Sequence, residues 1–160
     1  MNMELLIKQR VFSWTDAYDV YDATGAAKYF VKGEFFSLGH KIHIYRKDTG
    51  AELGCVSQRL LTLLPTFDIY VDGCVVGTVK KKFTFFTQDY QVDYRGWDVS
   101  GDFLGWEYSV TDGAREVMSI SKQWLSWGDT YTLSFNHPAD EIPGLLLVIA
   151  IDAANCDHND

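Results

Sequence analysis

The chain has 160 residues, 22 of them acidic and 14 basic, for a formal net charge of −8. This length suits one ordinary domain, and we expect residues 1–160 to form a single domain. Hydrophobic residues make up 47% of the chain and aromatic residues 15%, which supplies a substantial core and argues against disorder. The acidic balance argues against general nucleic-acid binding, which needs a basic surface.

The N-terminal residues Met1 to Lys8 lack the long apolar stretch of a signal peptide. No apolar stretch reaches the roughly 18 residues that a transmembrane helix needs. The cysteines Cys55, Cys74 and Cys156 are odd in number and form no C-x-x-C pair, so we expect free thiols in a reducing compartment. These features predict a cytoplasmic protein without a membrane span, and leave peripheral membrane association open.

Short segments of strand character follow one another through the first 135 residues. We expect about twelve strands, with candidates at 5–8, 18–21, 29–31, 42–45, 53–57, 60–64, 67–71, 75–79, 90–94, 97–99, 108–111, 116–120 and 131–135. The clearest hairpin signal is Asp72-Gly73, because this pair tolerates the positive φ angles of a type I′ turn.

The segment from Leu145 to Ile151 is apolar at every position. It has no polar face at the period of a strand or of a helix, so it must be buried on all sides. Pro143 suits the first turn of a helix, and leucine and alanine are good helix formers. We therefore expect a short C-terminal helix that the rest of the chain encloses.

An eight-stranded barrel is filled by its own side chains, and a helix with its side chains is about 10–12 Å across. Enclosing a helix therefore requires a wider ring of strands. The sequence predicts a mainly β fold: a closed barrel of about twelve antiparallel strands around a hydrophobic C-terminal helix. A sandwich with the helix on one face is the alternative, but it would leave one side of an apolar helix facing water.

Several ordered segments carry a family resemblance. They are YDVYD at 18–22 with Gly25, LLPTFDIY at 63–70, VKKKFTF at 79–85, GDFLG at 101–105, ISKQWLSWGDTY at 120–131, and the apolar run ending in Asp152. Together they resemble the LURP-one-related family, which is grouped with the tubby C-terminal domain and the phospholipid scramblases in one superfamily. The resemblance covers nearly the whole chain and implies a tubby-like barrel of twelve strands around a central helix. Because the family has no settled activity, the resemblance implies more about fold than about function.

The run Lys80-Lys81-Lys82 is the candidate binding feature of the sequence. In a strand, Lys80 and Lys82 share one face. Lys81 shares the parity of several apolar residues, so it must lie near a barrel mouth, at a bulge, or in a pair; these residues are Val75, Val79, Phe83 and Phe85. The resemblance to tubby domains implies a contact with anionic headgroups here, with further candidates Arg59, Arg46 and Lys47. The alternative is a solvated strand edge protected by lysine.

The chain contains no G-x-S-x-G, H-E-x-x-H, P-loop or G-x-G-x-x-G motif. His43 alternates with Ile42 and Ile44, so we expect it to point outward. Neither Cys55 nor Cys74 has a neighbouring histidine in sequence, although proximity in space stays open. We expect no catalytic residue, no metal site and no cofactor.

These observations together favour a monomeric, non-enzymatic binding or adaptor module. Its expected partner is an anionic phospholipid, such as a phosphoinositide, or a protein, and not a nucleic acid. The candidate ligand-binding residues are Lys80, Lys82 and Arg59. The alternative function is a scramblase-like protein whose C-terminal helix inserts into the bilayer. That segment is too short to span about 30 Å of hydrocarbon, and Asp152 would add a cost.

Overall fold

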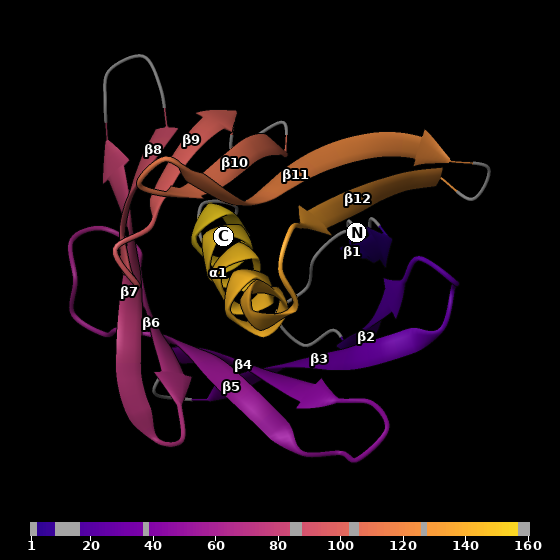
Figure 1. The fold of residues 1–160 in the computed structure, drawn as a ribbon. Coiled ribbons are helices and arrows are strands. Elements are labelled where there is room, and N and C mark those ends of the chain that lie inside the picture. The colour runs from indigo at the N-terminus through magenta and orange to yellow at the C-terminus, as the bar shows by residue number, and fades with distance from the viewer. Residues whose placement is uncertain are drawn as a thin grey trace.

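The computed structural model describes residues 3–8, 17–36, 39–83, 88–102, 106–125 and 128–156. These residues form twelve strands, one 3₁₀ turn and one α-helix (Figure 1). The elements are β1 (Met3–Lys8), β2 (Ala17–Asp22), β3 (Ala27–Phe36), β4 (Gly39–Arg46), β5 (Glu52–Gln58), β6 (Thr66–Val71), β7 (Cys74–Phe83), β8 (Gln88–Tyr94), β9 (Asp98–Asp102), β10 (Glu107–Asp112), β11 (Arg115–Leu125), β12 (Gly128–Phe135), η1 (Pro138–Asp140) and α1 (Glu141–Cys156).

All twelve strands belong to one antiparallel sheet that curls around the helix. In the described part of the chain, strands that are consecutive in sequence pair with each other, except β8 and β9, and β1 also pairs with β12. The order is therefore β8-β7-β6-β5-β4-β3-β2-β1-β12-β11-β10-β9. No ladder between described residues joins β8 to β9, so the barrel is nearly closed. The predicted fold class, a mainly β barrel of about twelve antiparallel strands with a C-terminal helix inside, is confirmed with this refinement.

Helix α1 lies in the middle of the barrel (Figure 1). Its side chains from Leu145 to Ile151 are all buried, against the inner faces of the strands. The largest fully buried strand side chains include Leu5, Tyr29, Ile42, Ile44, Phe67, Ile69, Met118, Ile120, Leu133 and Phe135. Burying one such side chain contributes about 1.5–3 kcal/mol, so the helix supplies much of the core.

Two glycines allow this close packing. A Cβ at Gly54 of β5 would lie 2.9 Å from Leu146 Cδ2 of the helix and 2.9 Å from the Tyr70 carbonyl oxygen. A Cβ at Gly144 would lie 2.5 Å from Phe135 Cε1. Both distances are shorter than van der Waals contact, so these two positions require glycine for the helix to sit against the wall.

Buried charges at the start of the helix are paired. The Glu141 carboxylate accepts a hydrogen bond from the Tyr29 hydroxyl and lies 2.5 Å from Lys28 Nζ. Asp140 Oδ2 accepts a hydrogen bond from Arg115 Nη1 of β11. Burial, and then the contact with Glu141, raise the pKa of Tyr29. These pairs tie the helix start to β3 and β11, and each removes the cost of an isolated buried charge.

Two local predictions were wrong. Residues 60–64 form no strand; they belong to the connection between β5 and β6, where Leu61 has φ +59° and leaves the extended conformation. Val75 does not face inward: it is exposed, because a bulge between Ile69 and Tyr70 shifts the register of the β6–β7 pair. Phe83 is described only in its backbone, and Phe85 lies outside the described residues.

Candidate functional site

The predicted alternation of the basic run is confirmed around Lys81. Lys80 and Lys82 are exposed on the outer face of β7, whereas Lys81 is fully buried inside the barrel. Lys81 lies opposite Tyr90 in the β7–β8 ladder. Only two of the three lysines can therefore meet a ligand in solvent.

Arg59 lies at the same end of the sheet as these two lysines. Its backbone N–H donates to the Thr66 carbonyl, and Thr66 is the β6 partner of Lys80. Its guanidinium already holds Asp68, with Nη2 to Oδ1 at 2.6 Å and Nε to Oδ2 at 3.1 Å. These hydrogen bonds raise the pKa of Arg59 and compensate part of its charge.

The other two candidate cations are not part of this group. Arg46 is the last residue of β4 and Lys47 follows it. The pairing of β4 with β5 places both at the end of the sheet away from Arg59. Lys47 Nζ is 2.9 Å from Asp19 Oδ1. Arg59, Lys80 and Lys82 thus lie at the same end of the sheet.

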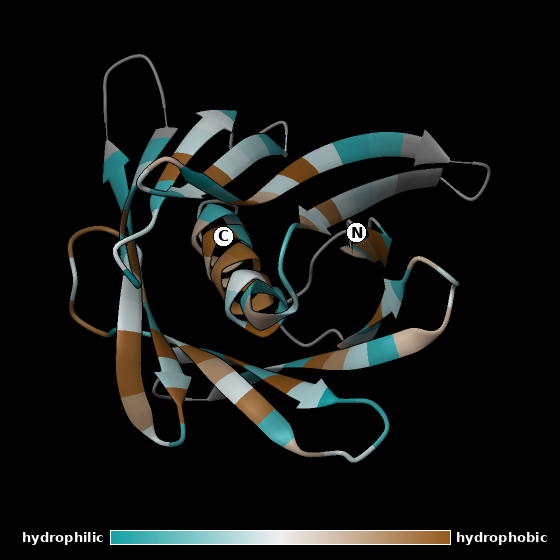
Figure 2. Cartoon of the chain, viewed as in Figure 1, coloured by the Kyte–Doolittle hydropathy of each residue, from teal (hydrophilic) through white to brown (hydrophobic). Residues whose placement is uncertain are grey.

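The segment 59–65, here called the leucine loop, begins at Arg59 and connects β5 to β6. Leu60 is 46% exposed, and Leu61 and Leu63 are fully exposed at 105% and 103%. The loop appears mostly brown at the left of the barrel in Figure 2. The Lys81 N–H donates to the Pro65 carbonyl, which extends the β6–β7 ladder and places Lys80 and Lys82 alongside the loop. Adjacent exposed aliphatic side chains on a soluble surface commonly mark a binding site.

A separate group of polar side chains lies on the outer faces of β4 and β5. His43 Nδ1 is 2.7 Å from Glu52 Oε1, and the potential ligand atoms of His43, Glu52 and Cys55 all lie within 4.8 Å of one another. Burial raises the pKa of the Cys55 thiol to about 11, with a further contribution from the Glu52 carboxylate. Sequence reasoning placed His43 outward correctly, but it did not place Cys55 beside it.

Two titratable groups lie near the end of the helix: Asp152 of α1, which retains some exposed surface, and Tyr108 of β10, which is buried. Burial raises the pKa of Asp152 to about 7. Burial, and then the charge of Asp152, raise the pKa of Tyr108 on β10 well above its ordinary value. Nothing in the sequence pattern marks Asp152 except that it interrupts an apolar run.

Comparisons with known proteins identify one family and one related fold. A model of the LURP-one-related family matches residues 3–152. A curated relative, the "Uncharacterized protein YxjI" of Bacillus subtilis (strain 168), is 36% identical over 150 residues, covering 94% of this chain and 92% of the relative. The X-ray structure of an Arabidopsis thaliana protein superposes with a TM-score of 0.61 at 18% identity, covering 94% of this chain and 90% of that chain. That last likeness supports the fold alone.

Among the described residues, no helix combines the length and the apolar character needed to cross a bilayer.

Proposed function

The chain belongs to the LURP-one-related family, and from that premise and its outer surface we propose that it is a non-enzymatic module that binds anionic phospholipid membranes. The leucine loop enters the interface between water and hydrocarbon. Arg59, Lys80 and Lys82 contact the phosphate groups of the lipids. The observation that carries this proposal is the pair of fully exposed leucines, Leu61 and Leu63, directly beside two exposed lysines.

The two kinds of side chain suit the two layers of a membrane surface. Aliphatic side chains gain free energy when they leave water for the acyl boundary, by about 25 cal/mol per Å² of apolar surface. A lysine or arginine near an anionic leaflet gains about 1 kcal/mol. Since neither contribution alone gives stable attachment, the combination of a hydrophobic tip and a basic flank is the relevant feature.

The local charge balance limits the affinity. Asp68 pairs with Arg59, and Lys82 faces Asp89 across the β7–β8 ladder. The net charge of −8 also opposes approach to an anionic surface. We therefore expect weak binding that falls steeply with salt, because screened charges lose their attraction beyond a Debye length of about 8–10 Å at 0.1–0.15 M.

The helix-insertion alternative has less support. Helix α1 is enclosed by the strands, and its start is held by the Glu141 and Asp140 ion pairs. Extraction of the helix would expose the inner faces of the barrel to water. Attachment through the leucine loop requires no such rearrangement.

The proposal is tested by flotation with vesicles of phosphatidylcholine alone, with added phosphatidylserine, and with added phosphatidylinositol bisphosphate, at low and at physiological salt. We expect retention on the anionic vesicles at low salt only. The double variant Lys80→Glu/Lys82→Glu should lose at least about 30-fold in vesicle affinity, from two cations at about 1 kcal/mol each. The matched control Arg46→Glu/Lys47→Glu makes the same charge change at the other end of the sheet, where β4 ends.

Failure of the wild-type protein to float with any anionic vesicle at low salt would overturn the lipid proposal. An equal loss in both charge-reversal variants would also contradict it, because the effect would then come from net charge and not from this surface.

A further inference from the structure

Three donor side chains of different types converge on the outer side of the β4–β5 hairpin. His43 supplies a ring nitrogen from β4, and Glu52 and Cys55 supply a carboxylate oxygen and Sγ from β5. These atoms lie within 4.8 Å of one another. On a tetrahedral zinc ion, with bonds of about 2.0–2.3 Å, neighbouring ligand atoms are about 3.3–3.6 Å apart. The observed spacing therefore reaches metal-binding geometry through side-chain adjustments of about 1 Å.

A bulge creates this convergence. Glu52 and Cys55 are three positions apart, so in a regular strand they would point to opposite faces. The register changes between Tyr45↔Glu52 and Ile44↔Gly54, which leaves Leu53 as the extra residue. As a result Cys55 lies directly opposite His43, and Glu52 stays on the same outer face. Bulges of this kind commonly re-aim side chains at functional sites.

The other ring nitrogen of His43 already has an orienting partner. His43 Nε2 is 3.3 Å from Glu34 Oε2 of β3. Histidines that bind metal through one nitrogen usually donate the other N–H to a carboxylate, which fixes the tautomer and the ring orientation. Glu34 occupies that place, whereas Glu52 Oε1 lies 2.7 Å from Nδ1.

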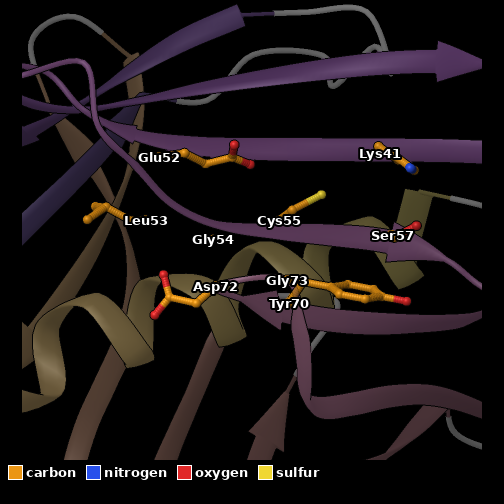
Figure 3. Close-up of a pocket in the computed structure, with 9 residues that line it drawn as sticks. All are labelled: Lys41, Glu52, Leu53, Gly54, Cys55, Ser57, Tyr70, Asp72 and Gly73. Atoms are coloured by element: carbon orange, nitrogen blue, oxygen red, sulfur yellow. The ribbon is translucent and has the colours of Figure 1, made fainter.

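The site is reachable from solvent. The side chain of His43 is 19% exposed, and Glu52 and Cys55 also line an open pocket of about 450 Å³. In Figure 3, Glu52 and Cys55 lie on one side of this pocket and Asp72 and Tyr70 on the other. Three protein donors would leave one position of a tetrahedral ion for water or a further ligand.

We propose that His43, Glu52 and Cys55 bind a divalent transition-metal ion, with zinc as the best fit, and that Glu34 is a positioning residue for the imidazole. Mixed nitrogen, sulfur and oxygen donors favour zinc over magnesium or calcium, which prefer oxygen ligands alone. On binding, the Cys55 thiol gives its proton to solvent and forms the zinc–sulfur bond as thiolate. This inference is independent of membrane binding, since the leucine loop contributes no ligand.

The test is a titration of the full chain with Zn²⁺ against a chromophoric chelator, and with Co²⁺ followed by absorption. We expect one equivalent of metal and, with Co²⁺, a thiolate-to-metal charge-transfer band together with the visible bands of tetrahedral coordination. Cys55→Ser and His43→Ala should each weaken metal binding by at least 100-fold and remove the charge-transfer band or alter it. The matched controls Cys74→Ser and His137→Ala, at exposed positions outside the group, should bind as wild type.

Glu34→Gln separates positioning from ligation. It should weaken binding about 10–100-fold while the cobalt–thiolate band persists, because the three ligands remain. Metal binding that survives both His43→Ala and Cys55→Ser would overturn the proposal, as would the absence of a thiolate band in the wild-type protein. Circular dichroism of each variant verifies that the outer-face substitutions leave the barrel folded.

Discussion

Two leucine-rich segments of this protein meet opposite fates. Leu145, Leu146 and Leu147 of α1 are completely buried, whereas Leu61 and Leu63 of the leucine loop are fully exposed. Their side-chain chemistry is the same, so hydrophobicity alone does not decide the outcome. The backbone does: a helix satisfies its own peptide groups and can be enclosed, whereas an irregular loop needs water or other partners for its peptide groups and stays at the surface.

The largest expected effect comes from a charge placed in the buried segment. Leu147→Asp should abolish folding, because transferring an ionised carboxylate from water to the fully buried site of a leucine is very costly. Soluble expression and circular dichroism check this. The matched variant Leu61→Asp should fold as wild type, and a folded Leu147→Asp protein would remove the contrast between the two segments.

Helix α1 already contains a carboxylate, Asp152, whose ionisation is unfavourable in the folded protein. Folding raises the pKa of Asp152 from 3.8 to about 7. Between these two pH values the carboxyl group is protonated in the folded protein and ionised in the unfolded chain. Stability should therefore be highest below about pH 4 as far as this group is concerned, fall as the pH rises toward 7, and then level off. Tyr108 of β10 lies near Asp152, because the charge of Asp152 contributes to the raised pKa of this tyrosine.

Asp152→Asn should remove this dependence and raise the free energy of unfolding at pH 8 by about 2–4 kcal/mol, at about 1.4 kcal/mol per pKa unit. Urea denaturation of both proteins at pH 5 and pH 8 measures the difference. An equal effect at both pH values would show that the carboxylate is not titrating in this range.

A smaller effect on stability is expected from a side chain added where the sheet and helix α1 are in closest contact. Gly54→Ala places a methyl group 2.9 Å from Leu146 Cδ2 and from the Tyr70 carbonyl. Overpacking of this kind costs about 1–3 kcal/mol, which denaturant unfolding would detect. Ser57→Ala, on the outer side of the same strand, is the control and should change stability by less than about 0.5 kcal/mol.

The smallest effect on folding, with the largest on function, is expected in the leucine loop. Leu61→Ser/Leu63→Ser should leave the free energy of unfolding within about 0.5 kcal/mol of wild type. Flotation on anionic vesicles should nevertheless be lost. Val75→Ser/Val76→Ser, two exposed valines in the β6–β7 hairpin, is the control for apolar area and should float normally.

The sequence predicted the interior better than the outer surface. A segment that is apolar at every position must be buried on all sides. The buried helix, and a barrel wide enough to enclose it, could therefore be predicted from residues Leu145 to Ile151. The alternation around Lys80 to Lys82 also held, because Lys81 shares the parity of Val79 in an unbroken stretch of ladder.

Bulges account for two features that the sequence did not predict. Strict alternation placed Val75 inward, and it would place Glu52 and Cys55 on opposite faces. In each case one extra residue in the ladder changes the outcome. The leucine loop was missed for another reason: an apolar run next to Pro65 has the composition of a strand, and the positive φ of Leu61 is visible only in the fold.

The position of α1 after all twelve strands has a consequence for how the protein is made. During synthesis the strands emerge before helix α1, so their apolar inner faces have no helix to pack against. Strand β1 can pair with β12 only after nearly the whole sheet has been made. The nascent chain thus passes through a stage in which its apolar surface is exposed and its barrel cannot close, a state prone to aggregation. Expression yield at higher temperature, and the need for chaperones, should depend on how soon helix α1 is synthesised and packs inside the barrel.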